Sequence, residues 1–155
     1  MKDIVAHTME YKGGLVQSDM ILEKYTDVYY EAYKNIYEDC FHIMRMELGL
    51  YPIDDCDSRD ELLKKRNDIF LFIINNILIG SIAVYDNEID DLIVAKEYQR
   101  KGYGKMLLNF AIAHMQEDGI FPIILHVADW NRNAIDLYLK NGFVITKTEI
   151  IKRIQ

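Results

Sequence analysis

The chain has little cysteine, proline or glycine: two, two and eight residues of 155. Cys40 and Cys56 lack the CxxC spacing, which argues against a disulfide framework and a cysteine-bound metal and predicts free thiols in a reducing cytoplasm. No segment is of low complexity and no repeat recurs at a fixed period, so linkers, disordered tails and solenoids are not expected. Half of the residues are apolar, which is enough to bury a core. We therefore expect one domain over residues 1–155.

The sequence also lacks a hydrophobic run long enough to cross a membrane. Its most apolar stretch, Ile69–Val84, is interrupted by Asn75 and Asn76 and is shorter than the roughly 20 residues that a spanning helix needs. The N-terminal sequence MKDIVAHTMEYK contains no apolar signal core. We expect no membrane insertion and no secretion, so the predicted location is the cytoplasm.

The chain also has fewer basic than acidic residues, and its formal net charge is -7. A duplex nucleic-acid binder normally carries a basic stripe that neutralises phosphates, so nucleic acid is not an expected partner. An acidic surface suits a cationic small molecule or peptide, although it also serves solubility alone. His7, His42 and His114 have no partners at metal-ligand spacing, and the aspartates near Cys56 lack the glycine of a calcium loop. We expect no metal.

The first third of the chain predicts a strand and two helices. Residues 2–11 read as a strand, and Glu23–Leu48 as a helix that ends at Gly49 and Pro52. A capping box of Ser58 and Glu61 opens a second, short helix. One stripe of the long helix is aromatic, and it either packs on the sheet or lines a substrate pocket. Its members recur every fourth residue: Tyr25, Tyr29, Tyr33, Tyr37 and Phe41.

The remainder alternates strands and helices. Asn75-Asn76 and Asp86-Asn87 read as hairpin turns within a three-stranded antiparallel meander. A helix then joins two strands that can lie side by side and parallel, which gives a mixed α/β sheet. The expected elements are strands 69–74, 77–85 and 88–95, helix 104–118, strand 120–127, helix 133–141 and strand 143–151.

The stretch QRKGYGK, residues 99–105, carries the strongest chemical signal. Gly102 and Gly104 leave several backbone N–H groups bare at the positive end of a helix dipole, which favours an anion and so a phosphate-bearing ligand. Two common phosphate loops do not match. The Walker loop needs glycine at Gln99, and the dinucleotide fingerprint needs glycine at Leu107. The alternative is a plain tight turn.

Two ordered motifs make the sequence resemble the GNAT superfamily of acetyl-CoA-dependent N-acetyltransferases. The family's pyrophosphate loop, Q/R-x-x-G-x-G/A, matches Gln99, Gly102 and Gly104. Its later N-x-x-A-x-x-x-Y-x-x-x-G-F segment matches five positions downstream: Asn131, Ala134, Tyr138, Gly142 and Phe143. The resemblance implies the GNAT fold, a central, mostly antiparallel twisted sheet with one parallel strand pair and helices on both faces. The family's usual last strand is missing or very short here, which leaves a homodimer possible.

The resemblance also implies a cofactor site for acetyl-CoA. Backbone groups of Ile93 and Val94 would pair with the pantetheine arm, and an N–H there would steady the oxyanion. Asn131 would contact the cofactor or order water, unless it only starts a helix. Lys101, Lys105 or Arg132 could meet the other phosphate, with solvated cations as the alternative. The pyrophosphate would be held by N–H groups of Arg100, Lys101, Gly102, Tyr103, Gly104 and Lys105.

Catalytic roles follow from the same resemblance. Tyr138 takes the position of the general acid, and a phenol can protonate a leaving thiolate; an ordinary half-buried tyrosine is the alternative. Glu88 takes the place of the glutamate base of the histone-acetylating branch; the alternatives are a solvent-facing carboxylate with no catalytic role at Glu88, and Asp90 or a water chain as the base. By strand alternation, Glu88, Asp90, Leu92 and Val94 share one face. His126 turns to the opposite face, where we expect it packed under a helix rather than catalytic.

We therefore expect an acyltransferase that moves an acetyl group from acetyl-CoA to a primary amine of a small molecule or peptide. Two alternatives stay open. The first is an acyl-CoA-binding sensor or interaction module that performs no transfer, and the second is a transferase for another acyl group.

Overall fold

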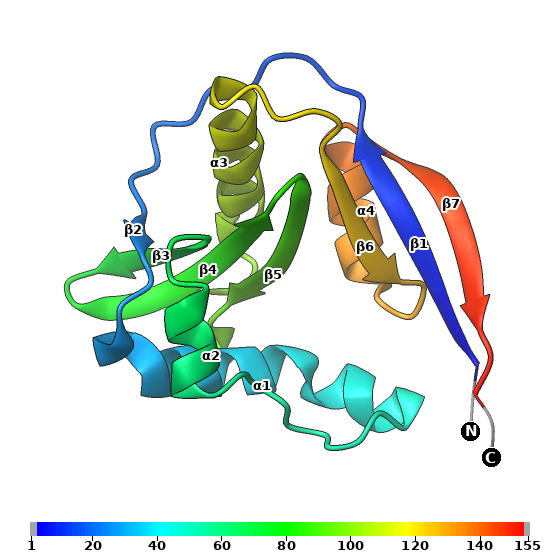
Figure 1. Cartoon of the computed structure of the whole chain (residues 1–155), viewed down its shortest axis with the longest axis horizontal. Coiled ribbons are helices and arrows are strands. Elements are labelled where there is room, and N and C mark those ends of the chain that lie inside the picture. The colour runs from blue at the N-terminus through cyan, green and yellow to red at the C-terminus, as the bar shows by residue number, and fades with distance from the viewer. Residues whose placement is uncertain (1–2, 154–155) are drawn as a thin grey trace.

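The computed structural model describes residues 3–153 (Figure 1). Most predicted elements are present, and helices α3 and α4 begin within one residue of their predicted starts. The elements follow in the order β1 (Ile4–Tyr11), β2 (Glu23–Lys24), the 3-10 turn η1 (Asp27–Tyr29), α1 (Tyr30–Leu48), α2 (Arg59–Lys64), β3 (Ile69–Ile74), β4 (Ile77–Tyr85), β5 (Glu88–Val94), the 3-10 turn η2 (Lys96–Tyr98), α3 (Tyr103–Glu117), β6 (Ile124–Ala128), α4 (Arg132–Lys140) and β7 (Phe143–Ile151).

Seven strands form one sheet in the order β2-β3-β4-β5-β6-β1-β7. Neighbouring strands are antiparallel except β5 and β6, which confirms the predicted mixed sheet with one parallel pair. That pair is short, because only Glu88 with Ile124 and Ile89 with Leu125 lie in register. Beyond Ile89 the two strands diverge and the sheet opens (Figure 1).

The N-terminal strand β1 completes the sheet on the far side of this opening. It pairs antiparallel with β6 on one edge and with β7 on the other. Residues from the two ends of the chain therefore lie side by side, and the partner of β7 comes from this chain itself. The strand predicted near the N-terminus is confirmed, and the described sheet has its free edges at β2 and β7.

Two apolar clusters cover the two faces of the sheet. One gathers buried residues of α3 and α4, such as Leu108 and Ile135, against Met9 and Ile82. The other lies under α1 and α2 and includes Tyr33 and Leu62. Burial of a side chain of this size contributes about 1.5–3 kcal/mol, so both faces stabilise the sheet. Helices on both faces were predicted, and the structure confirms them.

The long helix begins later than predicted. Instead of starting at Glu23, α1 starts at Tyr30, because the preceding residues extend the sheet edge: β2 pairs with β3, and the Tyr25 N–H donates to the Ile69 carbonyl at 2.9 Å. The aromatic stripe nevertheless stays continuous, with ring centroids 5.9 Å apart for Tyr25 and Tyr33 and 4.8 Å apart for Tyr37 and Phe41. Its first members pack on the sheet, and Phe41 lines a cavity.

Local signals for helix ends are confirmed. Ser58 and Glu61 form both hydrogen bonds of a capping box at the start of α2. Gly49 ends α1 with a left-handed φ of 66°. Among residues 3–153, no helix is both long enough and apolar enough to cross a membrane.

Candidate active site

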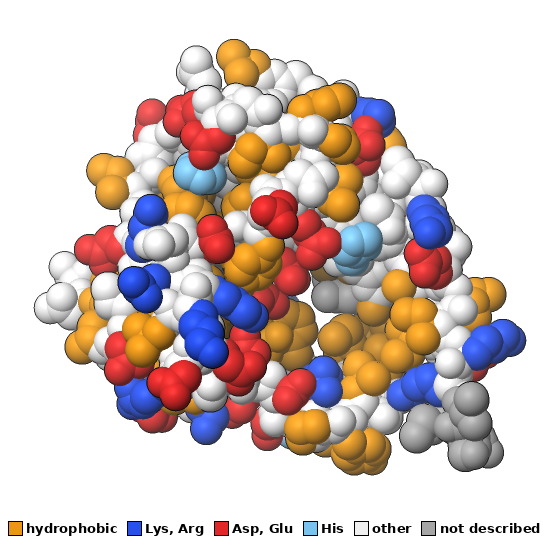
Figure 2. Space-filling model, viewed as in Figure 1, with side chains coloured by type: hydrophobic (Ala, Val, Ile, Leu, Met, Phe, Trp, Pro, Cys, Tyr) orange, Lys and Arg blue, Asp and Glu red, His pale blue; other side chains and the backbone are white. Residues whose placement is uncertain are grey.

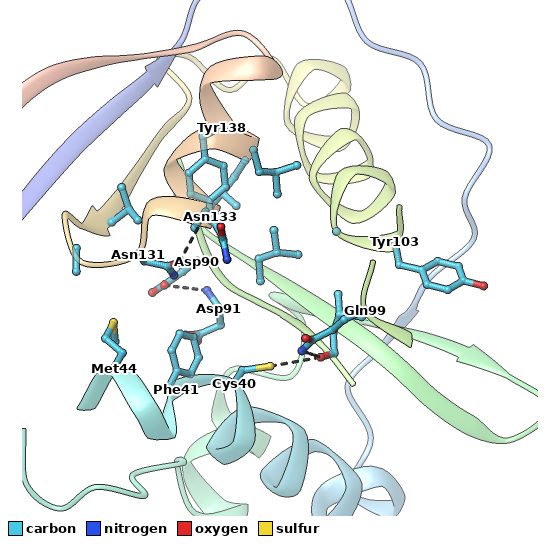
Figure 3. Close-up of a pocket in the computed structure, with 18 of the residues that line it drawn as sticks. Cys40, Phe41, Met44, Asp90, Asp91, Gln99, Tyr103, Asn131, Asn133 and Tyr138 are labelled. Atoms are coloured by element: carbon cyan, nitrogen blue, oxygen red, sulfur yellow. Dashed lines mark hydrogen bonds between the residues drawn. The ribbon is translucent and has the colours of Figure 1, made fainter. Parts of the chain in front are cut away.

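The divergence of β5 and β6 opens a cavity of about 830 Å³. Its walls come from α1, the end of β5, the loop before α3, the end of β6, and α4. Figure 3 shows Cys40, Phe41 and Met44 of α1 on the side opposite Tyr138, with Gln99 at the loop. Segments far apart in the sequence thus meet in one site.

The glycine loop forms one end of this cavity. Arg100 and Gly102 have left-handed φ values of 64° and 88°, and α3 begins directly afterwards at Tyr103. Apart from Gly102 itself and its chain neighbours, no atom lies within 4 Å of the place where a Cβ of Gly102 would stand. Since the first turn of a helix leaves its N–H groups without intrahelical partners, the loop offers several donors to an anion.

The predicted loop residues do not all face the cavity. Gln99, Arg100, Gly102, Tyr103 and Gly104 line it, whereas Lys101 and Lys105 are absent from its walls.

Two of the three cations that were candidates for the other phosphate already have neighbours. The Lys101 ammonium lies 5.6 Å from the centre of the Tyr98 ring, and Arg132 pairs with Asp129 at 2.9 Å.

The end of β5 forms the floor beside this loop. Its pairing with β6 has ended at Ile89, so the backbone edge of the following residues borders the opening. The Val94 carbonyl accepts a hydrogen bond from Gln99 Nε2 at 3.0 Å and a weaker one from Cys40 Sγ at 3.4 Å (Figure 3). Burial raises the pKa of the Cys40 thiol, which keeps it protonated as a donor.

Helix α4 contributes Asn131 and Tyr138. Asn131 caps the helix, since its Oδ1 accepts from the Ala134 N–H at 3.3 Å, and it also lines the cavity. The Tyr138 ring packs 5.9 Å from the Phe143 ring. Burial, and then the negative charge of Asp90, raise the pKa of Tyr138 to about 12. The phenol therefore keeps its proton at neutral pH.

A β-bulge interrupts β5. Its pairing with β4 slips between Ser81 and Ala83, so that four residues of β5, from Asp90 to Ile93, lie opposite three of β4, from Ala83 to Ser81. Asp91 adopts a φ of 50°, which is unusual for a residue other than glycine. An extra residue in one strand reverses the alternation of side chains beyond it.

Because of this bulge, the prediction that Glu88, Asp90, Leu92 and Val94 share one face of the strand is wrong. Leu92 and Val94 pack with Ile89 in the cluster beside α3, whereas Ile93 lies in the cluster under α1. Glu88 precedes Ile89 and therefore points to the other face from Val94. The sequence gives no signal for a one-residue slip between strands, so alternation alone placed Glu88 incorrectly.

His126 is also placed differently from the prediction. It alternates with buried Leu125 and Val127 as expected, but the face it occupies is open, and its side chain is 53% exposed. The ring lies 2.9 Å from Glu88 through Nε2 and 3.0 Å from the Thr8 hydroxyl through Nδ1. Rather than packing under a helix, His126 lines the cavity, and sequence reasoning missed it.

Carboxylates stand on the α1 side of the cavity. Asp90 and Asp91 both line it, and the Asp91 N–H donates to Asp90 Oδ1 at 2.8 Å. Burial, and then the charge of Asp90, raise the pKa of Asp91 to about 7. Figure 2 shows acidic side chains grouped in the middle of this face beside a hollow. The cavity is therefore acidic here, while the loop end offers Arg100 and backbone donors.

Asp91 gives a testable dependence of stability on pH. Its pKa rises from 3.8 to about 7 on folding, so between these values the folded state holds a proton that the unfolded state has lost. The contribution of Asp91 to the free energy of unfolding is therefore most favourable at low pH and is lost as the pH rises from 3.8 to about 7. We expect Asp91→Asn to raise the melting temperature by several degrees near pH ~8, with a gain that shrinks toward pH ~4.

Asp86→Asn is the matched control. Asp86 also has a left-handed φ, 54°, but lies exposed in a turn, so its substitution removes a charge without relieving burial. Thermal unfolding across the pH range compares the two variants. An equal gain for both at every pH would contradict the role assigned to Asp91 burial.

No metal site is apparent within residues 3–153. No group of three or more His, Cys, Asp or Glu side chains in this range is placed to hold an ion.

An open, mostly antiparallel sheet that splits after one parallel pair, with a glycine loop at the split, is the architecture that the GNAT resemblance predicted. The sequence model of the Acetyltransferase (GNAT) family matches residues 30–143. The chain therefore belongs to this family. The matched range includes the glycine loop and Tyr138 but not β1.

Individual relatives agree with this assignment. Streptothricin acetyltransferase A of Bacillus subtilis (strain 168) is 36% identical over 100 residues, which are 61% of this chain and 57% of the relative. L-ornithine N5-acetyltransferase NATA1 of Arabidopsis thaliana is 29% identical over 106 residues, which are 62% of this chain and 43% of the relative. The chain thus spans about half the length of these relatives.

Among solved structures, the PaiA N-acetyltransferase of Thermoplasma acidophilum in complex with coenzyme A superposes with a TM-score of 0.65. The two proteins are 24% identical, and the match covers 83% of this chain and 92% of that one. This similarity confirms the fold.

Proposed function

We propose that this protein is an acetyl-CoA-dependent N-acetyltransferase that acts on a primary amine of a small molecule or peptide by direct attack. One observation carries the proposal: the glycine loop, the unpaired end of β5 and the Tyr138 phenol surround a single cavity. Family membership supports the reaction class. The two free cysteines, Cys40 and Cys56, suit the reducing cytoplasm as the place of action.

The residues present suit coenzyme A. Backbone N–H groups of Arg100 to Lys105 would hold the pyrophosphate, because they stand at a helix start with open space at Gly102. The backbone of Ile93 and Val94 would bind the pantetheine arm along the edge that β6 leaves free. Asn131 borders the same cavity.

In the proposed reaction each group of the chain has a defined task. Acetyl-CoA supplies its acetyl group as a thioester, so a C–N bond to the amine forms, the C–S bond breaks, and coenzyme A leaves as the thiol. A backbone N–H at Ile93 or Val94 stabilises the negative charge that develops on the carbonyl oxygen. Tyr138 gives its proton to the departing sulfur and regains one from the acetylated nitrogen.

The acceptor we propose is a cationic amine. Asp90 and Asp91 border the α1 side of the cavity, and the whole chain carries a net charge of -7. Carboxylates in a partly enclosed cavity attract an ammonium group more strongly than they would in open water. The relatives named for streptothricin and for N5 of L-ornithine support an amine acceptor.

Thermal shift and thiol release in one sample test this function. We expect acetyl-CoA and coenzyme A each to raise the melting temperature, and thiol to appear with acetyl-CoA plus an amine. Cationic amines should react faster than neutral ones of similar size, by a margin that falls as salt is added. A shift without thiol release would favour a sensor, and equal, salt-independent rates would contradict the cationic acceptor. The absence of any shift would contradict cofactor binding.

A further inference from the structure

A hydrogen bond joins the two halves of the molecule across the opening of the sheet. Trp130, between β6 and α4, donates from Nε1 to Glu47 Oε2 near the end of α1, at 2.5 Å. The two residues are 83 positions apart in the sequence. An indole N–H only donates and an ionised carboxylate only accepts, so the pair is matched, and the charge of the acceptor strengthens the bond. We call this contact the Trp130–Glu47 bridge.

The bridge stands at the end of the cavity that lies away from the glycine loop. Figure 3 shows Met44 and Asn131 at one end of the cavity and Gln99 at the other. Glu47 follows Met44 by three residues, so it stands one turn further along the same side of α1. Trp130 directly precedes Asn131. Neither Glu47 nor Trp130 lines the cavity, so the bridge lies just beyond its last residues.

The segment that carries Trp130 is fastened to the sheet. The Asp129 N–H donates to the Val5 carbonyl at 2.8 Å, and the Asp129 carboxylate lies 2.7 Å from Nε2 of buried His7. Arg132 binds the same carboxylate at 2.9 Å. Trp130 is therefore held in place by its neighbours on both sides.

The other support, the end of α1, is fastened as well. Arg153, beyond β7, donates to the Leu48 carbonyl and, at 3.2 Å, to the Gly49 carbonyl. Arg45 donates from Nε to the Pro52 carbonyl at 3.0 Å. Because both supports are ordered by other contacts, forming the bridge costs little additional conformational entropy. An exposed contact of this kind is then a persistent part of the cavity's border.

The position of the bridge limits what can reach the transfer point. In the proposed reaction the glycine loop end of the cavity holds the pyrophosphate, so the acceptor occupies the end near the bridge. A lysine within a peptide carries main chain in two directions, and this chain needs an open trench between α1 and β6. The bridge crosses that trench. A free amine without such a chain fits on the near side of it.

We propose that the Trp130–Glu47 bridge restricts the acceptor to a compact free amine and excludes a lysine within a peptide chain. The cavity volume agrees with this, since about 830 Å³ must hold the pantetheine arm and the acceptor together, and a volume of this order suits small molecules. The inference rests on the proposed acetyl transfer and narrows its acceptor.

Two acceptors with the same reacting amine test the restriction. One is Nα-acetyl-lysine amide, and the other is an N-acetylated decapeptide whose only amine is a central lysine. We expect wild-type kcat/KM to be at least about tenfold higher for the compact acceptor. Glu47→Ala and Trp130→Ala each open the trench, so the ratio of peptide to compact rates should rise by about tenfold or more.

Matched controls separate the bridge from a general effect on α1. Glu47→Gln keeps a side-chain carbonyl that accepts the indole N–H, so the ratio should stay at its wild-type value. His42→Ala removes another contact of α1, since His42 Nδ1 lies 3.0 Å from Asp54, but this contact does not cross the cavity. Its ratio should also stay. If the alanine variants do not fold, Trp130→Phe serves, because it keeps an aromatic ring and removes only the donor.

Fluorescence tests the bridge without any turnover. Trp130 is the only tryptophan of the chain, so intrinsic emission reports on this side chain alone. It is 39% exposed in the bridged position. We expect quenching by acrylamide to increase in Glu47→Ala and to stay near the wild-type value in Glu47→Gln.

Several outcomes would overturn this inference. A wild type that acetylates the decapeptide as fast as the compact acceptor would show that the bridge excludes nothing. Unchanged ratios in both alanine variants would assign the selectivity to other residues, and equal quenching in wild type and Glu47→Ala would mean that the bridge does not form in solution. A wild type that releases no thiol with any amine would instead contradict the proposed function, whatever the quenching shows, and with it the acceptor limit.

Discussion

Tyr138→Phe is expected to lower kcat by about 10²- to 10⁴-fold, the usual contribution of a positioned general acid. The substitution removes the phenol proton and leaves the ring, which packs 5.9 Å from the Phe143 ring. With its pKa raised to about 12, the phenol is protonated throughout the working pH range, so the loss should be seen at every neutral pH. Turnover at saturating acetyl-CoA and amine measures the effect.

Tyr11→Phe is the matched control for this prediction. Tyr11 packs on the same Phe143 ring, with centroids 5.4 Å apart, but its hydroxyl donates to the Gly14 carbonyl at 2.7 Å. Loss of one exposed hydrogen bond should lower the free energy of unfolding by about 1 kcal/mol and leave kcat unchanged. If Tyr138→Phe instead kept wild-type turnover at saturation, water rather than the phenol would protonate the thiolate.

The elements that sequence predicts correctly are those encoded within a few residues. Asn75 and Asn76 have left-handed φ values of 51° and 64° in the turn between β3 and β4, as their side chains tolerate. Gly102 takes a left-handed conformation at the start of α3, and Ser58 caps α2. Each signal depends on the residue's own backbone preference, so tertiary contacts do not overturn it.

Predictions fail where the conformation of a segment depends on a partner that is distant in the sequence. Residues near Tyr25 are extended because β3 offers them hydrogen bonds, although their sequence continues a helical pattern. The place of β1 between β6 and β7 depends on pairings more than 100 residues apart in sequence. The sequence of a single strand does not determine which strands will pair with it, so the strand order of a sheet cannot be predicted from local sequence.

The candidate site shows the same difference between features encoded locally and features set by distant partners. Motif residues such as Gln99, Gly102 and Tyr138 were predicted, and the structure brings them to one cavity. Glu88 and His126 were assigned to opposite faces by alternation within their own strands. The parallel register of β5 and β6 instead puts them on one face, 2.9 Å apart, and the bulge turns Val94 to the other face, because faces depend on the register between strands as well as on alternation along one strand.

Gly102→Ala is expected to damage both stability and cofactor binding. At a φ of 88° an alanine costs about 1–2 kcal/mol, although no neighbouring atom blocks its Cβ. The melting temperature should fall by about 2–8 °C for a chain of this size. If the loop relaxes to relieve the strain, its N–H groups leave their positions. Since a hydrogen bond to a charged group contributes about 1.5–3 kcal/mol, coenzyme A should bind at least about tenfold more weakly.

Gly104→Ala separates backbone strain from loss of space. Gly104 lies in the first turn of α3 with an ordinary helical backbone, and its added Cβ would meet only Leu137 Cδ2 at 3.8 Å, a normal contact. Alanine favours a helix over glycine by roughly 1 kcal/mol, so this variant should melt at or above the wild-type temperature. Calorimetric titration with coenzyme A compares the two variants. Equal weakening by both would mean that bare backbone at either glycine is required, whereas weakening by Gly102→Ala alone identifies the left-handed turn as the feature that aims the loop at the phosphates.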